Sequence, residues 1–159
     1  MKAKHALERQ VVSLLKERHM KISFAESCTG GLLSGRLVNV PGSSEVYEEG
    51  YVTYSNEAKY RLLGVDRQTL GSYGAVSKQV AMQMAQGAAK RSGAQAAVGI
   101  TGVAGPGGGT PNKPVGLVYI GCYMEGNMTV TENYFSGSRG EVRKQAVEAA
   151  LELLVECLT

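Results

Sequence analysis

The sequence has few of the residues that build disulfide frameworks. Its three cysteines, Cys28, Cys122 and Cys157, are odd in number and widely spaced, and no CxxC pair occurs. This pattern argues against both a disulfide-stabilised fold and a zinc knuckle. It is typical of a reducing compartment, so we expect a cytoplasmic protein.

Histidine and aspartate are scarcer still. The two histidines, His5 and His19, fall in the first helical segment, and Asp66 is the only aspartate. A Ser-His-Asp triad needs a histidine that reaches the serine and an acid that orients it. HExxH, paired aspartates and Cys/His clusters are also missing. We expect any enzyme with this sequence to use a base other than histidine, with no metal and no other cofactor.

Long apolar runs and blocks of like charge are absent too. No segment reaches the length of a membrane span, and the charged N-terminus lacks the apolar centre of a signal peptide. The net charge is +3, and lysine and arginine are interspersed with glutamate. A nucleic-acid binder usually carries a concentrated basic patch. We therefore expect neither a membrane nor a nucleic acid as a partner.

The length and the apolar pattern predict the fold. A chain of 159 residues with 43% apolar residues has the size of one domain, so a single domain over 1–159 is expected. Apolar spacing predicts helices over 4–20, 30–38, 55–64, 77–93 and 142–157. Strands are predicted over 22–25, 51–54 and 96–101, followed by a hairpin of 115–123 and 128–135. This order predicts an α/β fold with three α/β/α layers around a mixed, mostly parallel sheet of about five strands.

Three loops should meet at one edge of that sheet. They are AESCTGG (25–31), YSNEAK (54–59) and the glycine-rich stretch 102–114, each following a predicted strand. In open sheets of this kind, ligands bind beyond the C-terminal ends of parallel strands.

Ser27 lies where the first strand turns into a helix. Backbone N–H groups near Thr29, Gly30 and Gly31 would then face the same space as its hydroxyl, which suits a phosphate or a developing oxyanion. An ordinary helix N-cap explains the same residues equally well. Cys28 is a second candidate nucleophile, ranked lower because a small thiol beside a buried strand more often serves packing.

Lys59 falls in the first turn of its predicted helix, where the helix dipole and partial burial disfavour the ammonium form. A neutral lysine there can take a proton from a serine. The alternative is a solvated surface lysine, which is the common fate of lysines. Tyr54 either passes the proton, holds the substrate or packs its ring on the sheet.

The glycine-rich loop offers bare backbone that can wrap an anion closely. It includes Gly102, Gly105 and Gly107, but it is not a Walker A loop, and a mobile loop explains the composition as well. Arg139, at the start of the last helix, is expected either to contact a phosphate or carboxylate or to remain solvated.

Read together, several motifs resemble one family. They are AESCTGG, YSNEAK, GAVS (74–77), TGVAGPGGGT, KPVG (113–116) and FSGSR, and they run in order from Ile22 to the final helix. This set resembles the C-terminal domain of the competence/damage-inducible CinA family, whose enzymatic members are nicotinamide mononucleotide deamidases. The resemblance implies an α/β/α fold, a homo-oligomer and hydrolysis of the mononucleotide's carboxamide to nicotinate mononucleotide and ammonia, a step of pyridine nucleotide recycling.

The same resemblance implies site roles. It makes Ser27 the nucleophile, with Lys59 and Tyr54 as activating partners, and it makes Thr101 and the loop after it the lining of the nucleotide pocket. Two departures concern substrate contacts more than chemistry. The family commonly has an acidic residue where this chain has Gly107, and GlyAspArg where it has Gly137, Ser138 and Arg139.

Two other functions fit the same motifs. One is a non-catalytic nucleotide-binding or regulatory domain of the same fold, which the two departures favour. The other is a general amidase that acts on a small metabolite other than a nucleotide.

Overall fold

A five-stranded mixed sheet forms the centre of the molecule. The computed structural model describes the backbone of residues 2–159 and the side chains of residues 7–159, so the side chain of His5 lies outside the described residues. The strand order is β2-β1-β3-β4-β5. The strands are β1 (Ile22–Glu26), β2 (Tyr51–Val52), β3 (Ala96–Gly102), β4 (Leu117–Met124) and β5 (Asn127–Tyr134). β1 pairs in parallel with β2 and β3, whereas β4 pairs antiparallel with β3 and β5. Of these described strands, only β4 runs antiparallel to the other four.

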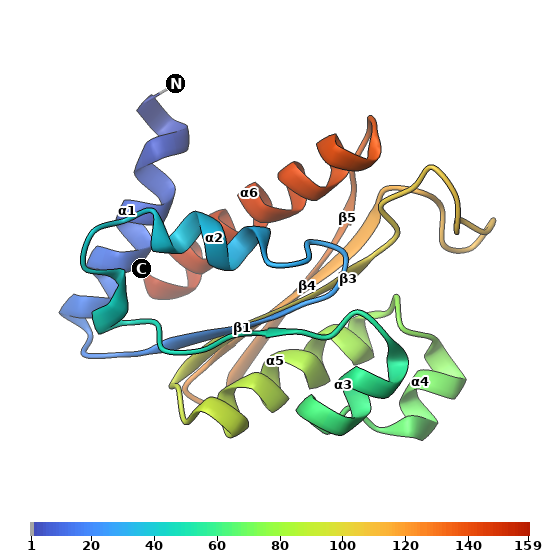
Figure 1. The fold of residues 1–159 in the computed structure, drawn as a ribbon, viewed down its shortest axis with the longest axis horizontal. Coiled ribbons are helices and arrows are strands. Elements are labelled where there is room, and N and C mark those ends of the chain that lie inside the picture. The colour runs from blue at the N-terminus through green and yellow to red at the C-terminus, as the bar shows by residue number, and fades with distance from the viewer. Residues whose placement is uncertain (1) are drawn as a thin grey trace.

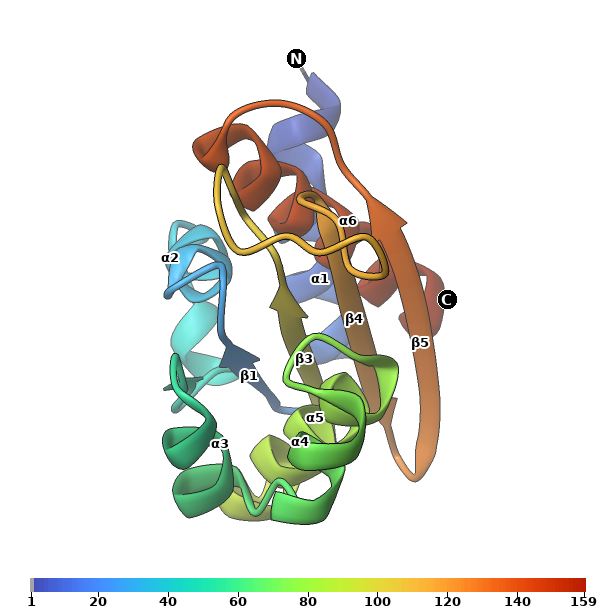
Figure 2. The ribbon, with the colours of Figure 1, turned by 90° about the vertical axis from the view of Figure 1, so that its right-hand side faces the viewer.

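Helices cover both faces of the sheet, as the sequence predicts (Figure 1). One layer contains α1 (Lys2–Glu17), α2 (Leu32–Val38) and α6 (Arg139–Leu158). The other contains α3 (Asn56–Leu63), α4 (Arg67–Tyr73) and α5 (Lys78–Ser92). Figure 2 shows α3, α4 and α5 together on one side and α1, α2 and α6 on the other. The α/β/α prediction is therefore confirmed.

The helix boundaries follow from side-chain capping. The Ser55 hydroxyl accepts the Ala58 N–H at the start of α3, and the Ser77 hydroxyl does the same for Val80 in α5. Gly64 ends α3 in a left-handed conformation, which glycine adopts without steric cost.

Two predicted elements have different bounds in the structure, and two further elements are missing from the prediction. The strand predicted over 51–54 has only two residues, because Thr53 and Tyr54 leave the sheet toward α3. The helix predicted over 30–38 begins at Leu32, since Gly30 and Gly31 precede it with φ of 56° and 104°. Helix α4, capped by the Asp66 carboxylate, is missing from the prediction, and so is a short 3-10 helix, Ser43–Glu45.

Two hydrophobic cores fix the layers. The larger lies between the sheet and α1, α2 and α6, and includes Phe24, Leu33 and Leu154. The smaller lies under α5 and includes Val80 and Met84. None of the described helices has the length and apolar character needed to cross a membrane.

The parallel strands bring the predicted loops together. β1 and β3 run side by side with Glu26 opposite Ile100, so both strands end at the same edge of the sheet. The Ser27 N–H donates to the Ile100 carbonyl at 3.1 Å just beyond that edge. The loops after β1, β2 and β3 therefore converge, as expected for an open parallel arrangement.

Candidate active site

The Ser27 hydroxyl and the Lys59 amine meet at this edge. Ser27 follows β1 and precedes α2. Lys59 comes from α3, which lies in the helical layer on the other face of the sheet. Lys59 Nζ lies 3.0 Å from Ser27 Oγ and donates at 2.9 Å to the Thr53 carbonyl. Only 8% of Ser27 and 1% of Lys59 is exposed. The amine is therefore held on the hydroxyl away from bulk water.

Burial changes the protonation of Lys59. It lowers the pKa of the amine from 10.5 to about 8, because desolvation disfavours the ammonium form; a Cys28 thiolate would act in the opposite direction. The described side chains place no carboxylate within ion-pair distance of Nζ to restore the charge. A fraction of Lys59 is thus neutral near pH 7 and able to accept a proton.

Glu26 is a site residue that the sequence reading missed. This fully buried carboxylate accepts the N–H groups of Gly31 at 3.2 Å, Leu33 at 2.9 Å and Ser34 at 3.0 Å. It therefore caps α2 from the preceding strand, which fixes the loop that carries Ser27. An acidic residue just before a serine was its only sequence signal.

The amides at the helix start are only partly available. The Gly30 N–H donates to the Ser27 carbonyl at 3.1 Å, and the Gly31 N–H is held by Glu26. The expectation that the Gly30 and Gly31 amides face the serine hydroxyl is therefore wrong, because backbone and carboxylate acceptors already use them. Within the described part of the chain, the N–H groups of Cys28 and Thr29 have no hydrogen-bond acceptor in another residue, and the Cys28 N–H contacts its own thiol.

An open cleft of about 310 Å³ lies over Ser27 and Lys59. Its walls come from the three converging loops, the connection between α4 and α5, and the start of α6. The lining residues are Ser27, Cys28, Tyr54, Asn56, Lys59, Ala75, Val76, Thr101, Gly102, Val103, Ala104, Gly105, Gly107, Gly108 and Arg139. Thr101, Gly102 and Gly105, which we expect to bind the substrate, thus line the cleft. Thr29, Gly30 and Gly31 are not among the lining residues.

Arg139 and Tyr54 form one side of the cleft. Arg139 Nη1 donates to the Gly105 carbonyl at 2.7 Å, and Nη2 donates to the Tyr54 hydroxyl at 2.9 Å. The Tyr54 hydroxyl bonds neither Ser27 nor Lys59 among the described residues, and the residue is 63% exposed. This position suits contact with a substrate better than proton relay.

The Cys28 thiol is a poor nucleophile where it lies. Burial raises its pKa to about 11, so it stays protonated at neutral pH. The described side chains also contain no group of three or more histidine, cysteine, aspartate or glutamate residues that could hold a metal ion.

The two departures from the family pattern have different consequences. Ser138 caps α6 in a capping box with Glu141, and serine and aspartate are equally good N-cap residues. Gly107 lines the cleft with open space around its Cβ position, so the missing acidic side chain changes the charge of the cleft.

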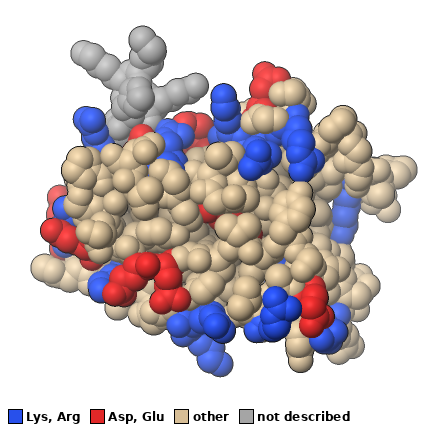
Figure 3. Space-filling view, viewed as in Figure 1, with Lys and Arg blue, Asp and Glu red and all other residues tan. Residues whose placement is uncertain are grey.

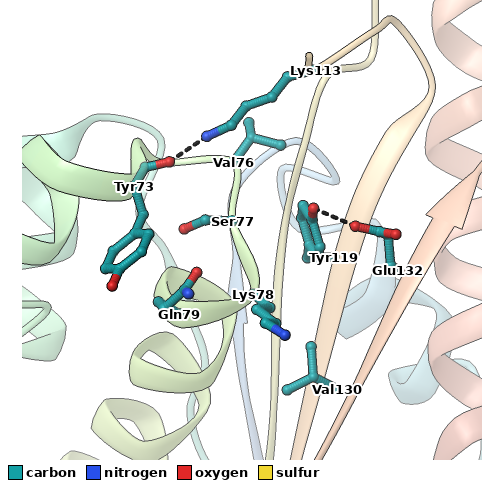
Figure 4. A pocket seen from close by; sticks show the side chains of 9 residues that line it. All are labelled: Tyr73, Val76, Ser77, Lys78, Gln79, Lys113, Tyr119, Val130 and Glu132. Carbon is teal, nitrogen blue, oxygen red and sulfur yellow. Dashed lines mark hydrogen bonds between the residues drawn. The ribbon is translucent and has the colours of Figure 1, made fainter.

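A second hollow, of about 450 Å³, adjoins the cleft and shares Val76 with it (Figure 4). The Ser77 hydroxyl there donates to the Gly74 carbonyl, and Lys113 donates to the Tyr73 carbonyl. No described base contacts the Ser77 hydroxyl, whereas the Ser27 hydroxyl has the Lys59 amine beside it.

Comparisons with known proteins give this site a family. A sequence model of the CinA C-terminal domain matches residues 4–158. A relative named competence-damage inducible protein in Clostridium botulinum (strain Okra) is 52% identical over 149 residues, covering 94% of this chain and 36% of the relative. The chain thus spans about a third of the length of the curated relatives it matches.

Solved structures of competence/damage-inducible proteins share the fold of this chain. The crystal structure of competence/damage inducible protein CihA from Agrobacterium tumefaciens is 45% identical, with a TM-score of 0.94 over 98% of this chain and 96% of that one. A competence or damage-inducible protein from Enterobacter asburiae is 34% identical, with a TM-score of 0.95 over 98% of each chain.

Proposed function

The chain belongs to the CinA C-terminal domain family, and we propose that its cleft hydrolyses the carboxamide of nicotinamide mononucleotide, giving nicotinate mononucleotide and ammonia. One observation carries the proposal: a buried lysine with a lowered pKa lies 3.0 Å from a serine hydroxyl in an open cleft. A serine is a weak nucleophile until a base takes its proton, and Lys59 supplies that base without a histidine.

The reaction proceeds by acyl transfer. Neutral Lys59 takes the Ser27 proton as Oγ attacks the carboxamide carbon, and the carbonyl oxygen becomes an oxyanion. The C–N bond then breaks, the Lys59 ammonium protonates the leaving nitrogen, and ammonia departs from a Ser27 ester. Water attacks that ester with Lys59 again as base, which releases the carboxylic acid and restores the serine.

The amides of Cys28 and Thr29, which have no acceptor in another described residue, are the proposed oxyanion donors. The N–H of the residue after a nucleophile is a common member of such donor pairs. A single donor of this kind contributes about 3 kcal/mol to the lowering of the barrier.

Arg139 is the proposed anchor for the substrate phosphate. It lines the cleft, and no described carboxylate lies within ion-pair distance of its guanidinium. A guanidinium presents five N–H donors, and two of them are engaged by Gly105 and Tyr54. The rest are available to a phosphate, which arginine binds through charge-assisted hydrogen bonds.

Ammonia release from nicotinamide mononucleotide tests the reaction and its nucleophile. Ser27→Ala should lower kcat by about 1,000-fold or more, as loss of the nucleophile does in serine hydrolases. Cys28→Ala should retain most of the activity, because that thiol is protonated at neutral pH. Full activity in Ser27→Ala would reject the assignment.

A non-catalytic nucleotide-binding domain is the second candidate. Gly107 favours it, because this cleft residue lacks the acidic side chain common in the family. Calorimetry and ammonia assays with the mononucleotide distinguish the two functions: binding without ammonia release supports the second candidate.

A further inference from the structure

The turn after Ser27 is held by a side chain that does not line the cleft. Arg143, on α6, donates from Nε to the Cys28 carbonyl at 2.9 Å and from Nη2 to the Thr29 carbonyl at 3.1 Å. A Cβ built on Gly30 would lie 3.2 Å from Arg143 Nη2, so the glycine leaves room for the guanidinium.

The Arg143 contacts and one backbone hydrogen bond fix the directions of the Thr29 and Cys28 amides. In a trans peptide the C=O and the following N–H point in opposite directions, and the cis bond of the described chain is elsewhere, at Gly105–Pro106. Arg143 holds the Cys28 carbonyl, which orients the Thr29 N–H away from α6. The Gly30 N–H holds the Ser27 carbonyl and thereby orients the Cys28 N–H.

The layers of the fold show which way the Thr29 N–H then points. Arg143 belongs to α6 and Lys59 to α3. These two helices lie in opposite layers of the fold (Figure 1). An N–H directed away from Arg143 therefore points toward the side where Lys59 meets the serine hydroxyl.

We propose that Arg143 is a positioning residue that orients the Cys28–Thr29 peptide so that its N–H serves as an oxyanion donor. This inference rests on the proposed acyl transfer at Ser27. Arg143 is not expected to touch the substrate, because its Nε and Nη2 are engaged by the Cys28 and Thr29 carbonyls on the α6 side of the turn. Its loss should affect the transition state, where the oxyanion forms, and leave substrate binding almost intact.

Kinetics of Arg143→Met provide the first test. Losing one oxyanion donor costs about 100-fold to 1,000-fold in kcat, so we expect kcat to fall by about 100-fold while KM changes less than about 3-fold. Lys144→Met is the matched control, because it removes one positive charge from an exposed neighbouring position on α6 and should keep wild-type rates. Guanidinium ion should restore part of the kcat lost in Arg143→Ala.

The pH profile separates positioning from a general charge effect. The inflection set by Lys59 should stay in place in Arg143→Met. A kcat within about 3-fold of wild type would overturn the inference, since a lost donor costs far more. A raised KM with normal kcat or a shifted inflection would overturn it too.

Backbone NMR tests the inference without turnover. The amide resonances of Cys28 and Thr29 should move in Arg143→Met and stay in place in Lys144→Met. Should Arg143→Met fail to fold, Arg143→Lys can be used. Its ammonium group keeps the positive charge but cannot reproduce the planar guanidinium geometry that donates to both carbonyls. Unmoved Cys28 and Thr29 resonances would overturn the positioning role. An inactive wild-type protein would instead reject the proposed function.

Discussion

At the scale of single residues, the site depends on how burial changes Lys59. Most lysines are solvated and charged, and this one is 1% exposed with its amine between Ser27 Oγ and the Thr53 carbonyl. The Ser27 hydroxyl and the Thr53 carbonyl offer hydrogen bonds to the amine, but neither carries a negative charge that would stabilise the ammonium form. The environment therefore favours the neutral form that a general base requires.

The first prediction concerns pH. Because only neutral Lys59 can accept the serine proton, kcat/KM for the mononucleotide should rise with pH through an inflection near 8, where its pKa lies, and level off above it. Lys59→Arg should lose this rise together with the activity, since a guanidinium stays charged. A flat profile between pH 6 and 10 in the wild-type protein would refute Lys59 as the base.

The second prediction concerns stability. The pKa of Lys59 is about 8 in the folded protein and 10.5 as a free side chain, so the unfolded state binds the proton more tightly. The resulting cost is fully present below pH 8 and vanishes as pH rises toward 10.5. The difference in pKa corresponds to a cost of about 3 kcal/mol. Replacing Lys59 removes this cost, but it also removes the hydrogen bond to the Thr53 carbonyl, which is worth about 1 kcal/mol.

Lys59→Met should therefore raise the free energy of unfolding at pH 7 by about 2 kcal/mol, measured by urea denaturation. The gain should shrink at pH 10. A destabilised variant at pH 7 would show that the amine stabilises the fold instead of straining it.

At the scale of elements, the decisive contact is between the last residue of β1 and the first turn of α2. Glu26 ends β1 and holds three backbone N–H groups at the start of α2, with a fourth bond from the Ser34 hydroxyl. The strand, the turn that carries Ser27 and the helix thus share one buried carboxylate. Displacing it would disturb the turn that carries Ser27.

The third prediction follows from that contact. Glu26→Gln should lower the free energy of unfolding by about 2–3 kcal/mol, because the amide NH₂ would face N–H donors that now have a charged acceptor. Ammonia release should fall with it. Glu57→Gln, in an exposed ion pair with Arg67, should change stability by less than about 0.5 kcal/mol. Equal effects of the two variants in urea denaturation would contradict the capping role of Glu26.

Sequence patterns predicted the elements better than the contacts between them. Ser55 and Ser77 as caps and Gly64 as a stop were readable, because capping is local chemistry. The stretch 67–73 had a good cap in Asp66 but only weak apolar periodicity, so α4 was missed. The roles of Glu26 and Arg143 depend on bonds between distant segments, which no local spacing encodes.

At the scale of the whole molecule, three parallel strands and α6 build one cleft with a positive charge at its side. The face shown in Figure 3 carries basic groups in separate places, with acidic groups between them. Arg139 lines the cleft, where its charge suits a small anion. The single domain, the cytoplasmic location, the absence of a nucleic-acid partner and the homo-oligomer remain predictions.

The fourth prediction concerns the substrate phosphate. A charge-assisted hydrogen bond contributes about 1.5–3 kcal/mol, so Arg139→Met should raise KM for nicotinamide mononucleotide by about 10-fold to 100-fold. The same variant should affect the unphosphorylated riboside much less, and wild-type protein should prefer the phosphorylated form. Equal losses with both substrates would mean that Arg139 acts through Tyr54 and Gly105, and a wild type indifferent to phosphate would favour a general amidase.

NMR titration of the Lys59 side chain in the resting protein tests the central claim most directly. The resonances next to Nζ report the charge of the amine without substrate, turnover or mutation. We predict a midpoint near pH 8, well below the 10.5 of a free lysine, because burial disfavours the ammonium form. A midpoint near 10.5 would contradict the account, since a fully charged amine cannot take the proton of Ser27.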